Sequence, residues 1–227
     1  MANPQGFDKL NILKKHSIPY PEYFADMELT PKQKKEREKF CYILEDLLII
    51  YFEMIKTSRD MGILNEYTIK QELMYNLYEA VDDKGFFENV EELDRYIADF
   101  VDTSYKTTIS NLDEHPNDMD YTGEQQYWIS EDRAKFIAED QSNTLFNSKD
   151  YVEAIKAGKT HKIWMAYPDD RVRPTHEETN GAKVPIDAYF DVGAARMLYP
   201  KDVTSEFSTG ASHPEECVNC RCVAVYV

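Results

Sequence analysis

The sequence CVNCRC, at residues 217–222, lies five residues from the C-terminus and holds three of the four cysteines of the chain. A second stretch, WMAYPDDRVRPTH at residues 164–176, combines two arginines, two carboxylates and a histidine. Forty residues rich in proline, glycine and short apolar pieces separate the two stretches. This composition predicts a compact, loop-rich module in which the two polar clusters fold onto each other.

The bulk composition narrows the classes of partner. The chain has 227 residues and a formal net charge of −16, and such a field repels nucleic acid and anionic membranes. Its apolar runs are shorter than the roughly 18 residues that a membrane span needs, and its N-terminus has no basic region followed by an apolar one. We therefore expect neither strong nucleic-acid binding nor a membrane location.

The first half of the sequence predicts helices. Residues 1–29 show no clear periodicity and suggest an arm whose aromatic residues, between Phe7 and Phe24, dock on this chain or on another. Thr30, Pro31 and Gln33 form the signature of a capping box, and apolar residues then recur at helical spacing as far as Ile55. Similar patterns predict helices at 65–81 and 89–112.

The second half predicts a different architecture. A polar loop at 113–123 precedes a helix capped by Ser130 and a separate short helix from Ser148 to Gly158. Residues 162–167 and 223–227 have the composition of strands. The predicted fold class is α+β, with an N-terminal helical region and a small C-terminal α+β or β-rich module, divided into residues 1–125 and 126–227.

The cysteine stretch is compatible with several chemistries. The C-x2-C spacing of Cys217 and Cys220 is common in zinc sites, and Cys222 adds a third thiol. His176 or His213 can complete four ligands. The alternatives are a packed pair of thiols and a disulfide to Cys217. The metal candidates are therefore His176, Cys217, Cys220 and Cys222, with zinc as the ion.

The polar stretch before His176 predicts a structural network. Asp169, Arg171, Arg173 and His176 combine rigid donors with carboxylate and imidazole acceptors, which can pin an irregular loop. An active site with His176 as base or ligand is the alternative. The sequence contains no nucleophile elbow, phosphate-binding loop or HExxH motif, so we assign no catalytic residue.

Three motifs in a fixed order resemble a known family. They are the helix 133–139 followed by Gly158 and Lys162-Ile163-Trp164, the stretch DDRVRPTH at 169–176 with Asn180-Gly181 and Val184-Pro185, and Tyr199-Pro200 followed by EECVNCRC at 215–222. Over residues 130–225 the chain resembles the phage Mu F-like minor head proteins, the phage head morphogenesis family. The family's cysteine pair corresponds to Cys220 and Cys222, and Cys217 is an addition to that pattern.

The resemblance implies a minor capsid protein of a tailed phage rather than an enzyme. Members are associated with the portal vertex and the inside of the procapsid, and some leave with the DNA. The implied partners are the portal protein and the major capsid or scaffold protein, and the implied locations are the virion and, during assembly, the host cytoplasm. Some relatives carry a toxin or enzyme domain after this module, and we expect none here because the chain ends soon after Cys222. The alternative is a metal-dependent enzyme that acts on nucleic acid or protein during infection.

Overall fold

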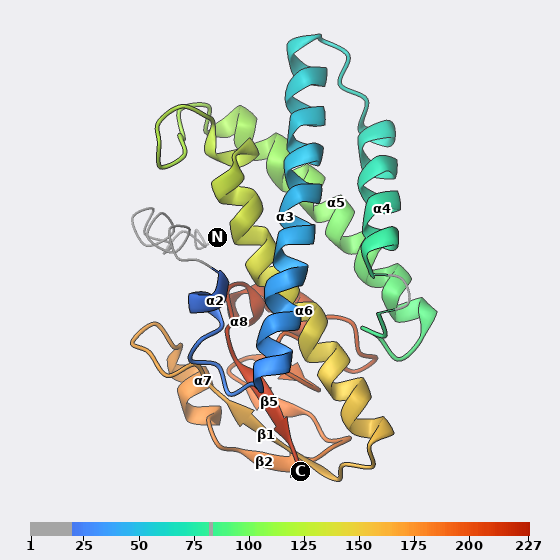
Figure 1. Cartoon of the computed structure of the whole chain (residues 1–227), viewed down its shortest axis with the longest axis vertical. Helices are drawn as coiled ribbons and strands as arrows, with labels where there is room; N and C mark the ends of the chain where they lie inside the picture. The colour runs from blue at the N-terminus through green and yellow to red at the C-terminus, as the bar shows by residue number, and fades with distance from the viewer. Residues whose placement is uncertain (1–19, 82–83) are drawn as a thin grey trace.

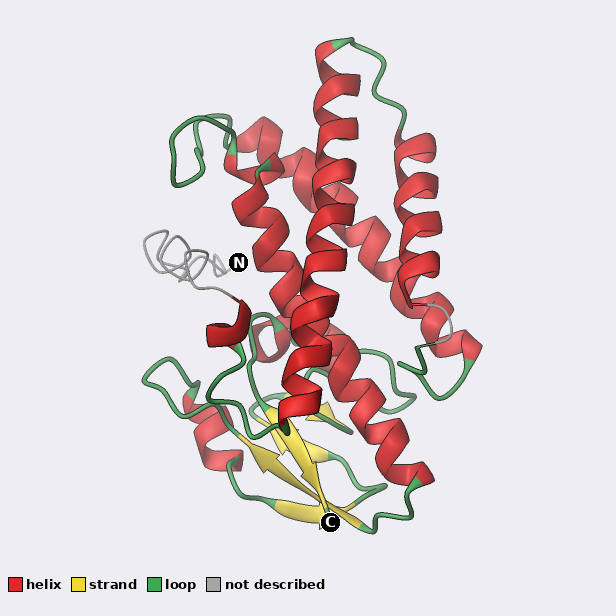
Figure 2. Cartoon of the chain, viewed as in Figure 1, coloured by secondary structure: helices red, strands yellow, loops and turns green. Residues whose placement is uncertain are grey.

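The computed structural model describes residues 20–81 and 84–227. A group of helices stands on a small layer of strands, as Figures 1 and 2 show. The helical elements are α2 (Tyr20–Tyr23), α3 (Pro31–Asp60), α4 (Glu66–Val81), α5 (Val90–Glu114), η1 (Tyr127–Ile129) and α6 (Glu131–Lys156). The C-terminal part contains β1 (His161–Met165), α7 (Pro174–Thr179), β2 (Lys183–Pro185), β3 (Phe190–Val192), β4 (Ala195–Met197), η2 (Gly210–Ser212), α8 (Pro214–Cys217) and β5 (Val223–Tyr226). The predicted α+β class is confirmed.

The long helices begin at the residues that their caps predict. The Thr30 hydroxyl accepts from the N–H of Gln33, and the Gln33 side chain accepts from the N–H of Thr30, so the capping box of α3 is complete. The side chain of Asn89 caps α5 and that of Ser130 caps α6. These caps satisfy backbone donors that the first helical turn leaves without partners.

The predicted helix start at Ser148 is wrong. Helix α6 runs without a break through Ser148, whose hydroxyl accepts a hydrogen bond from the Tyr199 hydroxyl at 3.1 Å inside the protein. Serine favours helix starts because its side chain can bond the local backbone. Here the Ser148 hydroxyl bonds Tyr199, 51 residues away in the sequence, instead of the local backbone. The preference of serine for helix starts therefore does not interrupt α6.

The helices share one apolar core. Phe40 of α3 and Phe146 of α6 lie against Phe86, with ring centroids 5.1–5.8 Å apart. Because α6 follows residue 125 and still packs into this core, the helical region and the C-terminal module meet along its length (Figure 1). The division into residues 1–125 and 126–227 stays a prediction.

The described end of the N-terminal arm is part of this chain's own core. Tyr20, Tyr23 and Phe24 are at most 4% exposed and pack with Cys41 and Val223. For these three residues the arm therefore docks on this chain, which is one of the two alternatives that the sequence left open, and Phe7 lies outside the described residues. Residues 20–29 therefore pack on α3 and on the last strand of this chain.

The strands form two small antiparallel sheets. The first has the order β2-β1-β5, with Lys162 opposite Tyr226 and Trp164 opposite Ala224. The second is the hairpin β3-β4, in which Gly193 turns with a φ of +58°. Trp164 points into the apolar cluster between the sheets and is fully buried. None of the helices in the described part of the chain combines the length and apolar character that crossing a bilayer requires.

Lys162 is a buried basic side chain in this layer. Its side chain lies between the rings of Tyr151 and Phe190, and its ammonium donates to the Ile186 carbonyl at 2.6 Å. Burial lowers the pKa of Lys162 from 10.5 to about 7, against the opposing pull of nearby carboxylates. Above about pH 7 the neutral amine therefore predominates in the folded protein.

We predict that this lysine makes stability depend on pH. Between about pH 7 and pH 10.5 the unfolded lysine binds a proton that the folded one releases, so the free energy of unfolding, relative to Lys162→Met, rises with pH by up to about 1.4 kcal/mol per unit. Urea unfolding at pH 6 to 10 measures this difference, and the exposed Lys159→Met is the control. A difference that stays flat across this range would contradict the assignment.

Candidate metal site

The short helix α7 carries His176 into the protein. Arg173 stands at its N-cap, Pro174 at its first position, and His176 in its last turn. The imidazole ring packs edge-on against the indole of Trp164, with centroids 5.6 Å apart and planes at 85°. Only 1% of His176 is exposed, so its two ring nitrogens must find partners within the protein.

The cysteine segment approaches from the other side. After α8, Asn219 adopts a φ of +58°, and the N–H of Cys220 donates to the Cys217 carbonyl at 3.2 Å. The chain then continues toward β5. Residues i and i+2 of extended backbone share a face, so Cys220 and Cys222 can present their sulfurs on the same side. Both are buried, at 1% and 2% exposure.

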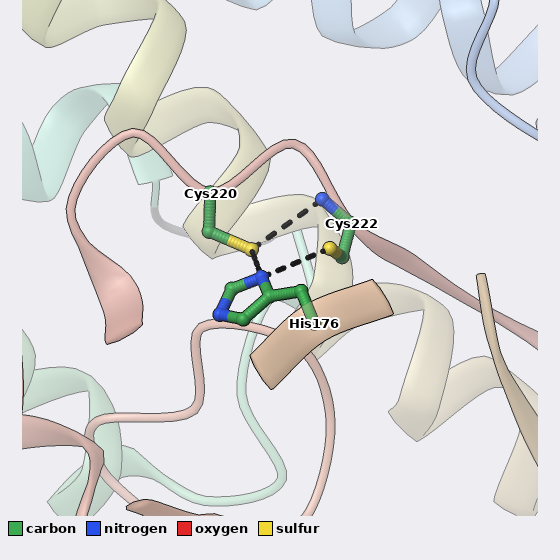
Figure 3. Close-up of side chains that lie close together, drawn as sticks. All are labelled: His176, Cys220 and Cys222. Atoms are coloured by element: carbon green, nitrogen blue, oxygen red, sulfur yellow. Dashed lines mark hydrogen bonds between the residues drawn. The ribbon is translucent and has the colours of Figure 1, made fainter. Parts of the chain in front are cut away.

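The three side chains meet around one nitrogen. Nδ1 of His176 lies 3.2 Å from Sγ of Cys222 and 3.6 Å from Sγ of Cys220, as Figure 3 shows. The three donor atoms lie within 4.8 Å of one another. The prediction that the histidine and the cysteine pair lie close in the fold is confirmed.

Glu216 fixes the orientation of the imidazole. Its Oε2 lies 3.1 Å from Nε2 of His176 and accepts from the Thr175 hydroxyl at 2.8 Å. A carboxylate at Nε2 favours the tautomer with its proton there, which leaves the lone pair of Nδ1 facing the sulfurs. The turn at Gly193 also closes on this carboxylate, because a Cβ at that position would lie 2.2 Å from its Oε1.

The two thiols do not ionise alike. Burial opposes ionisation of Cys220, but its contacts with the Cys222 thiol and the His176 ring outweigh burial and hold its pKa well below the ordinary value. The hydrogen bond to Cys220, followed by burial, raises the pKa of Cys222 well above that value. Of the two thiols, Cys220 is therefore the one that ionises more readily.

This donor set fits a metal ion. An imidazole nitrogen and thiolate sulfurs are the usual zinc ligands, and bond lengths of about 2.0 and 2.3 Å at a tetrahedral angle place such atoms about 3.5 Å apart. The nitrogen–sulfur distances of 3.2 and 3.6 Å are close to that value. The carboxylate behind the imidazole matches the outer-shell support that metal-bound histidines usually have.

Two further candidate ligands lie elsewhere. The thiol of Cys217 faces the Gly210 carbonyl at 3.4 Å and the Met197 sulfur at 3.7 Å, and burial raises its pKa to about 12. His213 pairs with Glu215 at 2.9 Å. All four cysteines are free thiols. Among the described residues, the group that can share one ion contains His176, Cys220 and Cys222.

The other residues of the predicted network form separate contacts. Asp169 pairs with Arg171 at 3.0 Å and with the less exposed Arg221, whose guanidinium stacks on the Tyr167 ring. Burial works against ionisation of Asp169, but the contact with Arg221 holds its pKa below the ordinary value. Arg173 donates to the Val218 carbonyl. These contacts brace the loop before α7 against the cysteine segment from outside, whereas His176 faces inward.

Sequence reasoning missed Glu216 and Arg221 as partners of the network. Both lie in the EECVNCRC stretch. A carboxylate and a guanidinium so close to three cysteines could have indicated that they take part in the same network. It also missed Asn143 and Asn147 of α6, which are buried and donate to backbone carbonyls of the cysteine segment. Their only signal is two amides four residues apart on one helix, which is too common to be diagnostic.

The fold and the buried site describe an α+β protein whose C-terminal module closes around a histidine and two cysteines. The family described as phage Mu protein F like protein matches residues 103–225, more than half of the chain, and the protein belongs to this family of phage head morphogenesis proteins. The match begins earlier than the expected residue 130, within α5, and ends in β5. No curated protein and no solved structure matches the chain.

Proposed function

We propose that this protein is a minor capsid component of a tailed-phage head, placed inside the shell near the portal, and that its C-terminal module is a structural unit stabilised by zinc. The family supports a role in head morphogenesis. The observation that carries the structural role is the burial of the donor set: His176, Cys220 and Cys222 are 1–2% exposed. Because these three side chains are buried, a substrate could not reach them.

The proposed partners are the portal protein and the major capsid or scaffold protein. The net charge of −16 supports a protein that stays free of the packaged DNA, since like charges repel at short range. The same charge fits assembly in the host cytoplasm and incorporation into the virion. Ejection with the DNA is a further part of the proposal, and the family is its support.

An enzymatic role is the second candidate. Cys220, His176 and Glu216 have the composition of a nucleophile, a base and an orienting acid, and three protein ligands leave a fourth metal position open, as in catalytic zinc sites. Against this stand the burial of all three donors and the absence of the motifs sought in the sequence. Rapid alkylation of Cys220 in the native protein would favour the enzyme.

The first test of the proposal is the metal content. We expect about one zinc per chain, and chelation should lower the melting temperature by about 10 °C, the equivalent of roughly 4 kcal/mol of linked binding energy. Cys220→Ser, Cys222→Ser and His176→Ala should lose the metal. Cys217→Ser and Cys41→Ser are the matched controls, because both replace buried free thiols outside the donor group. Zinc retained by all three site variants, or lost by the controls, would contradict the assignment.

The second test is the location. Heads purified from infected cells and treated with protease should retain the protein at a few copies per head, because the capsid shell shields internal components. Quantitative mass spectrometry before and after disruption of the shell measures this, with the major capsid protein as the copy-number standard. Heads without the protein, or heads from which protease removes it, would overturn the internal location.

A further inference from the structure

The backbone of the cysteine segment has an unusual source of hydrogen bonds. Cys220 and Cys222 precede β5, which pairs with β1 only from Val223 onward. Their carbonyls are buried within the protein and outside the strand ladder. A buried carbonyl without a donor costs free energy, so another element must supply the partners that a neighbouring strand would give.

Helix α6 supplies them from one face. Asp140, Asn143 and Asn147 stand at i, i+3 and i+7, which places them on one side of the helix. Oδ1 of Asp140 accepts from the N–H of Asn219 at 2.7 Å, where the chain turns with its positive φ. The Asn147 amide donates to the Cys222 carbonyl at 3.1 Å. We name these three side chains the α6 polar row.

Asn143 is the centre of this row. Its amide nitrogen donates to the carbonyl of Cys220 at 3.0 Å and to the carbonyl of Cys222 at 3.3 Å. Both partners are acceptors, which fixes the amide with its nitrogen toward the segment. The side chain is fully buried. One amide thus holds the two carbonyls of the C-x-C segment on one edge, and this keeps both sulfurs on one face.

Asn147 and Asn143 differ in the number of segments that they contact. Asn147 also donates to the Pro200 carbonyl at 3.0 Å and accepts from Arg37 at 3.4 Å, so it joins several segments. Both hydrogen bonds of the Asn143 amide nitrogen go to the two residues that carry the sulfurs. Its loss should therefore disturb the sulfurs more than the fold.

We propose that Asn143 is a positioning residue of the His176–Cys220–Cys222 site, acting through the backbone to hold the two sulfurs at the spacing that one metal ion requires. This inference rests on the metal role proposed above. Outer-shell groups of this kind typically change metal affinity by about 10- to 100-fold when removed.

The test uses Co²⁺ as the probe on the full chain. Asn143→Leu keeps the size of the side chain and removes its donors. We expect this variant to bind Co²⁺ about 10- to 100-fold more weakly than the wild type and to lose intensity in the thiolate-to-cobalt charge-transfer band. Asn111→Leu is the matched control, since it makes the same change at a helical asparagine whose amide donates to the Thr107 carbonyl within α5. If the leucine variant does not fold, Asn143→Ala serves, because it removes the same donors without adding apolar bulk.

A readout without metal keeps the two proposals apart. Backbone amide exchange of residues 219–223 in the metal-free protein should be about ten-fold faster in the Asn143 variant, with the core of α3 and α6 unchanged. If the wild type binds no Co²⁺, the metal role falls, and exchange alone decides whether Asn143 orders the segment. An Asn143 variant with wild-type Co²⁺ affinity, spectrum and exchange would overturn the inference.

Discussion

Side-chain amides of α6 take the place of a strand beside the cysteine segment and donate the hydrogen bonds that its buried carbonyls require. The segment must be extended to place two sulfurs on one face, yet it lies beyond the reach of the β1 ladder. Asn143 and Asn147 satisfy its carbonyls from a rigid helix. The same helix packs against α3 in the apolar core. The hydrogen bonds from α6 therefore connect the cysteine segment to the core of the protein.

Buried charges reinforce the same junction. Arg37 of α3 pairs with Asp150 of α6 at 2.8 Å, and Lys201 pairs with Asp140 across the module. Removing one member of a buried pair typically costs about 3–5 kcal/mol, since the other charge is left without compensation. Such pairs reward one arrangement of the module on the helices and penalise others. A single arrangement of the module keeps the three donor atoms of the site within a few ångströms of one another. It also keeps the surfaces of a head protein in one orientation relative to each other.

The sequence was informative where local chemistry decides and uninformative where distant partners decide. Thr30, Asn89 and Ser130 start helices because their side chains bond backbone groups three residues away, and that spacing can be read directly. The approach of His176 to Cys220 and Cys222 also followed from two polar clusters in one small module. Ser148, by contrast, has the local signature of a cap, but its partner is Tyr199. The contacts of Glu216 and Asn143 could not be predicted from the sequence, because neither residue has a sequence neighbour that indicates its partner. The burial of Tyr20 and Phe24 likewise depends on packing against Cys41 of α3 and Val223 of β5, which are distant in the sequence.

In the proposed structural role, one zinc ion is held jointly by His176, Cys220 and Cys222. X-ray absorption at the zinc edge of the purified protein tests this claim most directly, because it counts sulfur and nitrogen neighbours independently of stability. The account predicts two sulfur ligands at about 2.3 Å and an imidazole nitrogen at about 2.0 Å. It also predicts that the zinc-edge signal disappears in His176→Ala, because this variant should lose the metal. A spectrum with only oxygen and nitrogen neighbours, or with three sulfurs and no imidazole, would contradict it.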